Sequence, residues 1–403
     1  MSAPTLESTV RLPQPDGTLS AYRLPEPIDW PVPQQPLAAR KAYAAAHVVP
    51  VMTADNTPGA PAVLDWETTL ELRRRIWGLG LGVADAMDTA QRGMGLDWAA
   101  TAELIERSSA AAAAELGRGN PALAGLGVRD LIACGAGTDQ LTPGADLAQV
   151  RRAYAEQLEV VEAAGAKVVL MCSRALAATA RDWSDYRDTY AELLRRADQP
   201  VILHWLGTMF DPALAGYWGS ADIPTATRNF LSLIEEHADK VDGVKVSLLD
   251  ARHEVALRAA LPAGVRLYTG DDFNYPELID GDGDQHSDAL LGIFAAIAPA
   301  ASAALQRYDA SDPQRGREIL DSTRELGRHI FAAPTFHYKT GIAFLAWLNG
   351  DQSGFQMVGG MQSARSLVHL GQTLRLAGEA GLLRRPDLAA ERFAALSSIG
   401  GVR

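Results

Sequence analysis

Short apolar runs alternate with longer amphipathic segments from about residue 45 onward, and this alternation constrains the fold more than any other feature of the chain. Seven runs are clear and an eighth is weaker: His47–Met52, Leu79–Ala84, Val128–Cys134, Lys167–Cys172, Pro200–Leu203, Gly243–Leu248, Val265–Thr269 and Ala289–Ala298. The segments between them have helical periodicity: Asp65–Trp77, Trp98–Leu116, Leu147–Ala164, Trp183–Ala197, Thr225–Ala238 and His253–Leu261. Strands that alternate with helices in this way form right-handed βαβ units around a parallel sheet. The pattern therefore predicts an α/β fold, a (β/α)8 TIM barrel over residues 45–300.

A doubly wound open sheet is the alternative arrangement of the same elements. A dinucleotide-binding sheet of that kind carries Gly-x-Gly-x-x-Gly directly after its first strand. The glycines of Gly78–Gly82 instead precede or begin a predicted strand, so the geometry that cradles a phosphate is missing. The barrel is the favoured fold for this reason.

The two ends of the chain differ from the central pattern. Residues 1–36 hold eight of the 22 prolines, and we expect residues 1–44 to form a proline-rich arm. Arg11–Pro13 and Ala21–Leu24 are possible strands of a hairpin around the Asp16-Gly17 turn. Residues 301–403 are expected to form a C-terminal helical region packed on the barrel. The expected helices in and just before this region are Pro299–Tyr308, Pro313–Phe331, Tyr338–Asn349, Ala364–Ala380 and Pro386–Leu396.

Charge and cysteine content exclude several classes of partner. A net charge of −12 argues against a nucleic-acid-binding surface and against binding to anionic membranes. No apolar stretch reaches the ~18 residues that span a bilayer, and the N-terminus lacks the basic-then-apolar order of a secretion signal. Cys134 and Cys172 lie in apolar runs, which indicates free thiols in a reducing compartment. A cytoplasmic location is expected.

Lys245, in the segment Asp242-Gly243-Val244-Lys245-Val246-Ser247, is one of only five lysines in the chain. An ammonium group between valines near the end of an apolar strand is costly to desolvate, and burial lowers the pKa of a lysine. The neutral amine can attack a carbonyl group to form a Schiff base. The alternatives are an ion pair with Asp242 or Asp250, and a side chain that extends to the surface.

Polar residues follow the predicted strands at the end where a parallel barrel carries its chemistry. These candidate site residues are Asp55, Asp85, Asp88, Ser173, Arg174, His204, Lys245, Asp271 and Asp272. The aspartates can move protons or orient hydroxyl groups, but they can equally cap helices or form turns. His204 is either a proton-transfer group or a core histidine, and Arg174 can bind a carboxylate or pair with a loop aspartate. His337 and Tyr338 precede a C-terminal helix, where they either reach the mouth of the site or, as we expect, have a structural role.

Three segments, Gly243-Val244-Lys245, Thr269-Gly270-Asp271-Asp272 and Tyr338–Ala343, follow one another along the chain. They resemble the sixth-strand Gly-Ile-Lys, the seventh-strand Ser-Gly-Asp-Asp and the C-terminal helix start of the dihydrodipicolinate synthase / N-acetylneuraminate lyase superfamily, a group of class I aldolase-type barrels. More narrowly, the chain looks like an uncharacterised bacterial branch of that superfamily, a domain of unknown function. The resemblance implies a Schiff base on Lys245 and a homo-oligomer, either a dimer or a tetramer. No cofactor or metal is expected.

Two motifs of the superfamily are replaced in this chain. Its Gly-Thr-Thr-Gly-Glu, which holds a pyruvate carboxylate, would fall near Val83–Thr89, where the residues are Val-Ala-Asp-Ala-Met-Asp-Thr. Its proton-relay tyrosine would fall near Ser173-Arg174. Asp88 and Arg174 stand at these positions instead, so pyruvate is not carried over as the substrate.

The leading hypothesis is a Schiff-base-forming lyase, an aldolase or a dehydratase, that acts on a polar oxo acid or oxo-sugar. Lys245 attacks the carbonyl group, and Asp88 or His204 moves the proton. The expected substrate-binding residues are Asp55, Asp85, Ser173, Arg174, Asp271 and Asp272. One alternative is a metal-assisted aldolase or isomerase that uses Asp55, Asp88, His204 and Asp271. The other is a non-catalytic barrel that binds a small molecule.

Overall fold

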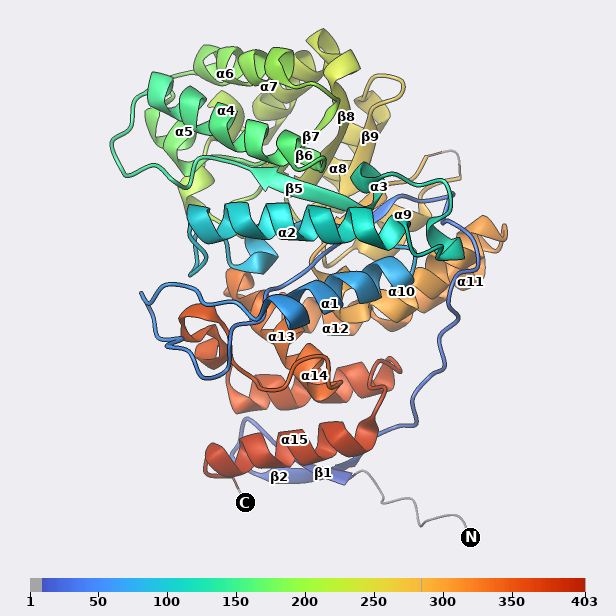
Figure 1. Ribbon diagram of the computed structural model, residues 1–403. Helices are drawn as coiled ribbons and strands as arrows, with labels where there is room; N and C mark the ends of the chain where they lie inside the picture. The colour runs from blue at the N-terminus through green and yellow to red at the C-terminus, as the bar shows by residue number, and fades with distance from the viewer. Residues whose placement is uncertain (1–8, 284, 403) are drawn as a thin grey trace.

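A closed barrel of eight parallel strands forms the centre of the protein (Figure 1). The structure is a computed structural model, and it describes residues 9–283 and 285–402. The barrel strands are β3 (Ala42–Ala45), β4 (Gly82–Asp85), β5 (Ile132–Ala136), β6 (Lys167–Leu170), β7 (Val201–Leu206), β8 (Val241–Ser247), β9 (Arg266–Thr269) and β10 (Asp288–Leu291). β10 pairs with β3 and so closes the ring. The predicted (β/α)8 barrel is confirmed.

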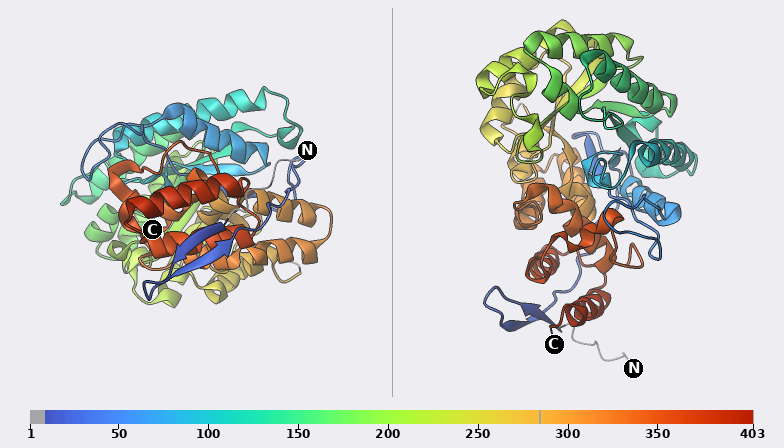
Figure 2. Two further views of the ribbon diagram at one scale, coloured as in Figure 1. Left: turned by 90° about the horizontal axis from the view of Figure 1, so that it is seen from below. Right: turned by 90° about the vertical axis from the view of Figure 1, so that its left-hand side faces the viewer.

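A ring of helices surrounds the strands, as the right-hand view of Figure 2 shows. The long helices of the ring are α1 (Trp66–Gly78), α2 (Trp98–Leu116), α4 (Leu147–Ala163), α6 (Trp183–Arg196), α7 (Ile223–Glu236), α8 (Ala251–Ala260) and α10 (Ile293–Asp309). Shorter helices are α3 (Val128–Leu131), α5 (Arg174–Thr179) and α9 (Tyr275–Asp280). Six of the long helices begin after an aspartate whose side chain accepts a hydrogen bond from a backbone N–H of the first turn. These aspartates are Asp65, Asp97, Asp146, Asp182, Asp222 and Asp250.

The interior of the barrel is filled by alternate residues of the strands, because successive side chains of a strand point to opposite faces. Its members include Tyr43, Ala45, Ala84, Ala133, Val169, Ile202, Tyr268 and Leu290. The rings of Tyr43 and Tyr268 each pack against a glycine of the neighbouring strand. A Cβ atom on Gly82 would lie 2.5 Å from the ring of Tyr43, and one on Gly243 would lie 2.7 Å from the ring of Tyr268.

Three strand boundaries differ from the sequence-based expectation. The first strand is Ala42–Ala45 and not His47–Met52, because three small alanines flank the one large interior side chain, Tyr43, and carry little strand signal of their own. Val128–Leu131 is a short helix before β5. The run Ala289–Ala298 is split between β10 and α10, since periodicity cannot separate a buried strand from a buried helix.

The C-terminal helices pack against one side of the barrel, as expected, and the N-terminal hairpin covers them (Figure 1). The helices are α11 (Pro313–Ser322), α12 (Arg324–Ile330), α13 (Tyr338–Leu348), α14 (Leu367–Glu379) and α15 (Pro386–Ile399). The hairpin strands β1 (Thr9–Pro13) and β2 (Leu19–Arg23) pair across the Asp16-Gly17 turn, as predicted. Val10 and Leu12 of β1 are buried, and β1 contacts α14 and α15. The first eight residues of the expected arm lie outside the described part of the chain.

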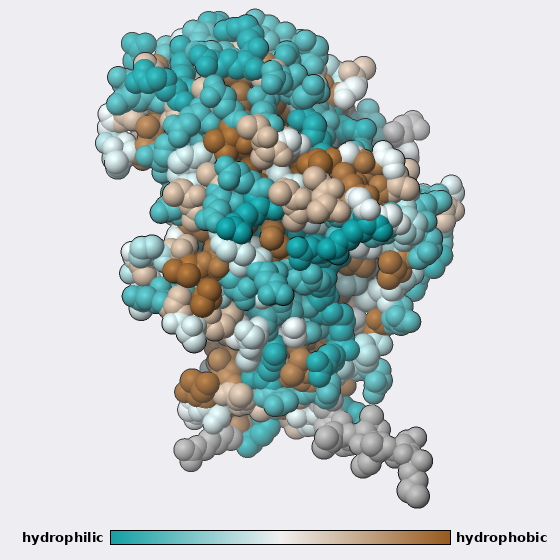
Figure 3. Space-filling model, viewed as in Figure 1, coloured by the Kyte–Doolittle hydropathy of each residue, from teal (hydrophilic) through white to brown (hydrophobic). Residues whose placement is uncertain are grey.

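The exterior face in Figure 3 is mostly hydrophilic over α6 and α7, and its hydrophobic residues form small separate groups. Within residues 9–283 and 285–402, no helix combines the length and the apolar character needed to cross a membrane. Both cysteines are free thiols: Cys134 is buried and Cys172 is half-buried.

Asp85 points away from the barrel interior, so its predicted place in the barrel mouth is wrong. Its neighbour Ala84 faces the interior, and the alternation along β4 turns Asp85 outward toward α1. There the carboxylate accepts hydrogen bonds from Nε and Nη2 of Arg73 at 2.8 and 2.6 Å. Both side chains are fully buried. Arg73 also donates to the carbonyl groups of His47 and Thr69, so this pair ties together β3, β4 and α1.

Replacing Asp85→Asn should lower the free energy of unfolding by about 3–5 kcal/mol, because it leaves the Arg73 guanidinium buried without a counter-charge. Urea unfolding followed by circular dichroism measures the change. Glu103→Gln is the matched control, since Glu103 pairs with Arg107 on the exposed face of α2 and should change stability by less than ~1 kcal/mol. Equal effects of the two substitutions would contradict this account of the buried pair.

Candidate active site

The carboxyl ends of the parallel strands meet at one end of the barrel, which faces the viewer in the right-hand view of Figure 2. Strand register places three side chains of β7, β8 and β9 beside one another: His204 pairs with Lys245, and Lys245 pairs with Tyr268. Ile202 and Tyr268 face the interior, so His204 and Lys245 face it as well. Lys245 therefore lies inside the barrel.

The amine of Lys245 has no hydrogen-bond or ion-pair partner among the described residues. Burial lowers its pKa, and the charges of Asp272 and Asp88 oppose this effect only in part. The side chain crosses the backbone of Gly270, where an added Cβ atom would lie 2.9 Å from Cε of Lys245 and would also meet Oγ of Ser247. Glycine in the Thr-Gly-Asp-Asp segment thus provides the space that the lysine occupies.

Asp272 is the buried carboxyl group that interacts with Lys245. It is 3% exposed, and its carboxylate accepts a hydrogen bond from the backbone N–H of Ile293 at 2.8 Å. Burial raises the pKa of Asp272, while the positive charge of Lys245 lowers it. Burial thus acts on both groups in the same sense, favouring a neutral amine on Lys245 and a protonated acid on Asp272.

Asp88 lies at the start of the short 3-10 helix η1 (Asp88–Ala90) and binds a lysine from the C-terminal region. Its carboxylate accepts a hydrogen bond from Nζ of Lys339 at 3.1 Å. Lys339 is fully buried and also donates to the carbonyl group of Phe336 at 2.9 Å. The pair attaches the first turn of α13 to the carboxyl end of β4.

Tyr338 is the site residue that the sequence analysis placed in a structural role. Its hydroxyl group lies 2.5 Å from Oγ1 of Thr89, and its ring stacks on Phe331 with centroids 4.2 Å apart. Burial is the main cause that raises the pKa of Tyr338, and the charges of Asp88 and Asp272 also raise it. Because the charges of both carboxyl groups act on the Tyr338 hydroxyl, we assign Tyr338 to the candidate site. In the sequence, the only signal for a place in the site is the position of Tyr338 at the start of the segment Tyr338–Ala343.

His204 is held as a neutral imidazole. Its Nε2 lies 3.2 Å from Oγ of Ser247, and Nδ1 is buried without a partner among the described residues. Burial first, and then the charge of Lys245, lower the pKa of His204 well below its usual value. His204 and Ser247 therefore form a neutral polar pair beside Lys245.

Ser173 and Arg174 lie at the start of α5, on the rim of the barrel. Oγ of Ser173 caps the helix by accepting from the N–H of Leu176 and lies 2.6 Å from Oγ1 of Thr138. Arg174 is 63% exposed and pairs with Asp211 at 2.5 Å. Burial is the main cause that lowers the pKa of Lys339, and the charge of Arg174 adds to it.

The other two predicted residues have local roles, and the structure does not bring them to Lys245 as side-chain partners. Asp271 accepts hydrogen bonds from the backbone of Phe273 and Asn274, which forms the turn after β9. Asp55 is exposed and bonds only Thr57 in a turn. In the described part of the chain, no group of three or more His, Cys, Asp or Glu side chains could hold a metal ion.

Glu254 of α8 supports the Thr-Gly-Asp-Asp segment from the outer side of the barrel. Its carboxyl group accepts hydrogen bonds from Oγ1 of Thr269 at 3.0 Å and from Oγ of Ser287 at 2.8 Å. Oγ1 of Thr269 in turn accepts from the backbone N–H of Asp271. Glu254 is 1% exposed, and burial raises its pKa to about 8.

Comparison with known proteins gives one family and one fold. A family model described as "Protein of unknown function (DUF993)" matches residues 10–402. None of the curated proteins matches the chain significantly in sequence.

Several solved structures share the fold, and those of dihydrodipicolinate synthases are prominent among them. The enzyme of Acinetobacter baumannii complexed with pyruvate is 16% identical, with a TM-score of 0.59 over 86% of this chain and 100% of the other. The enzyme of Aquifex aeolicus is 12% identical, with a TM-score of 0.59 over 85% and 99%. A prophage protein of the same family from E. coli K12, in complex with pyruvate, is 14% identical, with a TM-score of 0.59 over 84% and 99%. The likeness confirms the resemblance at the level of the fold.

The raised pKa of Glu254 should make stability fall with pH. The folded protein holds the proton more tightly than the unfolded chain, whose glutamate has a pKa near 4.5. The free energy of unfolding should therefore decrease by roughly 3–5 kcal/mol as pH rises from about 4.5 to 8, and then level off. Glu254→Gln should remove this part of the slope in urea unfolding at a series of pH values. Identical slopes for the wild type and the variant would refute the assignment.

Proposed function

We propose that this chain, which belongs to the DUF993 family of proteins of unknown function, is a Schiff-base-forming lyase that acts on a small oxo compound through Lys245. The observation that carries the proposal is the half-buried, unpaired amine of Lys245 inside the carboxyl end of the barrel, with its pKa lowered by desolvation. The shared fold with dihydrodipicolinate synthases supports the same kind of reaction. Two of the similar structures were determined with pyruvate.

The first step of the proposed reaction is the formation of the imine. The neutral amine of Lys245 attacks the carbonyl carbon of the substrate, and a C–N bond forms while the carbonyl electron pair moves to oxygen. The nitrogen loses a proton and the oxygen gains one, which gives a carbinolamine. Asp272, whose pKa is raised by burial, supplies the proton that lets the hydroxyl group leave as water. The protonated imine remains on Lys245.

The second step uses the protonated imine as an electron sink. Breaking a C–H or C–C bond next to the imine carbon moves an electron pair toward nitrogen and gives an enamine. In this proposal the Tyr338 hydroxyl takes the proton from that carbon while its own proton passes to the neighbouring Asp88 carboxylate, and the reverse transfer returns it. His204 stays neutral and holds Ser247 beside Lys245. Asp88 anchors Lys339, and so positions the turn that presents Tyr338.

We place an oxo acid ahead of an oxo-sugar as the substrate. Arg174 lies on the rim of the barrel, and its positive charge acts on the buried amine of Lys339. Positive charge at the mouth of the site favours a carboxylate substrate. Arg174 is 63% exposed and shares its guanidinium with Asp211, so a substrate carboxylate can compete for it.

Sodium borohydride should trap a covalent adduct between the protein and a 2-oxo acid, and mass spectrometry should locate it on Lys245. Lys245→Ala should abolish the adduct. Lys240→Ala is the control, because Lys240 bonds only a backbone carbonyl group on the outside of the barrel, and it should leave trapping unchanged. As pH is raised, the trapping rate should increase and reach its plateau at a pH below 10.5, the usual pKa of a lysine. The reason is that only the neutral amine reacts. An adduct that survives Lys245→Ala would overturn the assignment.

Tyr338→Phe should separate proton transfer from imine formation. We expect borohydride trapping to persist while exchange of the substrate hydrogens next to the carbonyl group, followed by NMR in D2O, slows by about 10²–10⁴-fold. The matched control is Tyr275→Phe, because Tyr275 makes a buried 2.5 Å hydrogen bond with Thr323 outside the barrel. Equal exchange rates in the two variants would remove Tyr338 from the mechanism.

A further inference from the structure

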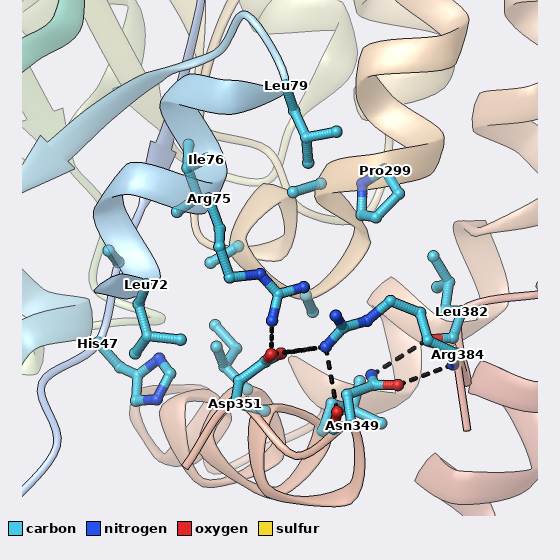
Figure 4. Close-up of a pocket in the computed structure, with 17 residues that line it drawn as sticks. His47, Leu72, Arg75, Ile76, Leu79, Pro299, Asn349, Asp351, Leu382 and Arg384 are labelled. Atoms are coloured by element: carbon cyan, nitrogen blue, oxygen red, sulfur yellow. Dashed lines mark hydrogen bonds and ion pairs between the residues drawn. The ribbon is translucent and has the colours of Figure 1, made fainter. Parts of the chain in front are cut away.

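A cavity lies outside the barrel, between α1, α10 and α13 (Figure 4). Its volume is about 70 Å³. The apolar part of its wall includes Leu72, Ile76, Leu79, Pro299, Ile342 and Leu345. None of the residues that line it is Lys245 or a side-chain partner proposed above for the imine chemistry. The cavity is therefore separate from the candidate active site.

Two arginines share one carboxylate at the polar end of this cavity. Figure 4 shows Arg75 and Arg384 approaching Asp351 from two sides. Nη2 of Arg384 donates to both carboxylate oxygens at 2.6 and 2.7 Å, and Nη1 of Arg75 forms an ion pair with the same group. Asn349 fixes the segment by accepting from the backbone N–H of Arg384 at 2.8 Å.

The polar end therefore has an excess of positive charge and of hydrogen-bond donors. A guanidinium carries five N–H donors, and the contacts with Asp351 use one terminal nitrogen of each arginine. The side chains are only partly open to water, with exposures of 34% for Arg75, 38% for Arg384 and 13% for Asp351. Burial, followed by the charge of Arg384, lowers the pKa of Arg75 to about 10, and the charge of Glu71 opposes this only in part. An anion placed here would offset this repulsion.

We propose that this cavity binds a short aliphatic carboxylate, with the carboxylate on Arg75 and Arg384 and the alkyl chain against the apolar wall. Bidentate recognition of carboxylates is the typical use of arginine, and an apolar cavity with a few placed polar groups is typical of small-molecule sites. Since one water-sized atom takes roughly 10–15 Å³ of such a cavity, about five to seven non-hydrogen atoms fit. This size corresponds to chains of three to five carbons.

The cavity is joined to the candidate active site by one helix. Ile342, Leu345 and Ala346 of α13 line the cavity, and the first turn of α13 carries Tyr338 and Lys339. A ligand in the cavity therefore contacts the helix that presents these two side chains. The proposal of a binding site stands without the proposed function, because it concerns other residues and a binding measurement.

Isothermal titration of the full-length protein with butyrate tests the proposal. We expect saturable binding of one equivalent, with much weaker binding of 1-butanol and of chloride at equal ionic strength. Arg384→Met should weaken butyrate binding at least tenfold by removing one guanidinium. Ala346→Leu should do the same by filling the cavity while leaving both arginines in place. Arg375→Met is the control, because Arg375 lies on α14 and pairs with Glu379 at the surface.

Four outcomes would overturn the proposal: no saturable binding to the wild type, equal binding of 1-butanol, equal binding of chloride, or binding that neither Arg384→Met nor Ala346→Leu weakens. The last outcome would place the ligand elsewhere, including the candidate active site, which a titration of Lys245→Ala would reveal. If Arg384→Met fails to fold, Ala346→Leu alone decides the location of the ligand.

Discussion

The closed ring of parallel strands is the constraint on which the rest of the structure depends. A barrel of eight strands closes only if alternate side chains fill its interior. Here Tyr43 and Tyr268 supply the volume, and Gly82 and Gly243 supply the room for their rings. The same alternation decides where each polar residue goes: Lys245 and His204 face inward, whereas Asp85 faces α1 and binds Arg73. Core packing and chemistry are set by one rule of strand geometry.

Burial then gives the inward lysine its chemical character. An ammonium group in the barrel interior is poorly hydrated, and the carboxyl groups of Asp272 and Asp88 compensate only in part. Gly270 has no side chain and so leaves room for the side chain of Lys245. Glu254 accepts a hydrogen bond from Thr269 and so fixes the segment that contains this glycine. The C-terminal region completes the site, because α13 brings Tyr338 to Thr89 and Lys339 to Asp88. The barrel thus provides the nucleophile, while a helix beyond it provides the hydroxyl group.

The sequence predicted what local patterns control. The helix Trp98–Leu116 has the predicted bounds, because its periodicity and the cap at Asp97 are local signals. Lys245 and Asp272 were predicted in the barrel mouth because the strand count and segment order place them there. Asp85 was misplaced because the inward or outward direction depends on a strand end that is uncertain by one residue. Tyr338 was assigned a structural role because its contact with Thr89 joins residues 249 positions apart, and no local pattern reports such packing.

The central claim is that Lys245 acts as a neutral nucleophile inside the barrel. A crystal structure of the protein soaked with a 2-oxo acid, without any reductant, tests this claim most directly. The account predicts continuous electron density from Nζ of Lys245 to the carbonyl carbon of the ligand, with Asp272 and Tyr338 next to the bound molecule. An intact oxo acid in the site with a separate lysine side chain, or a covalent bond to another residue, would contradict it.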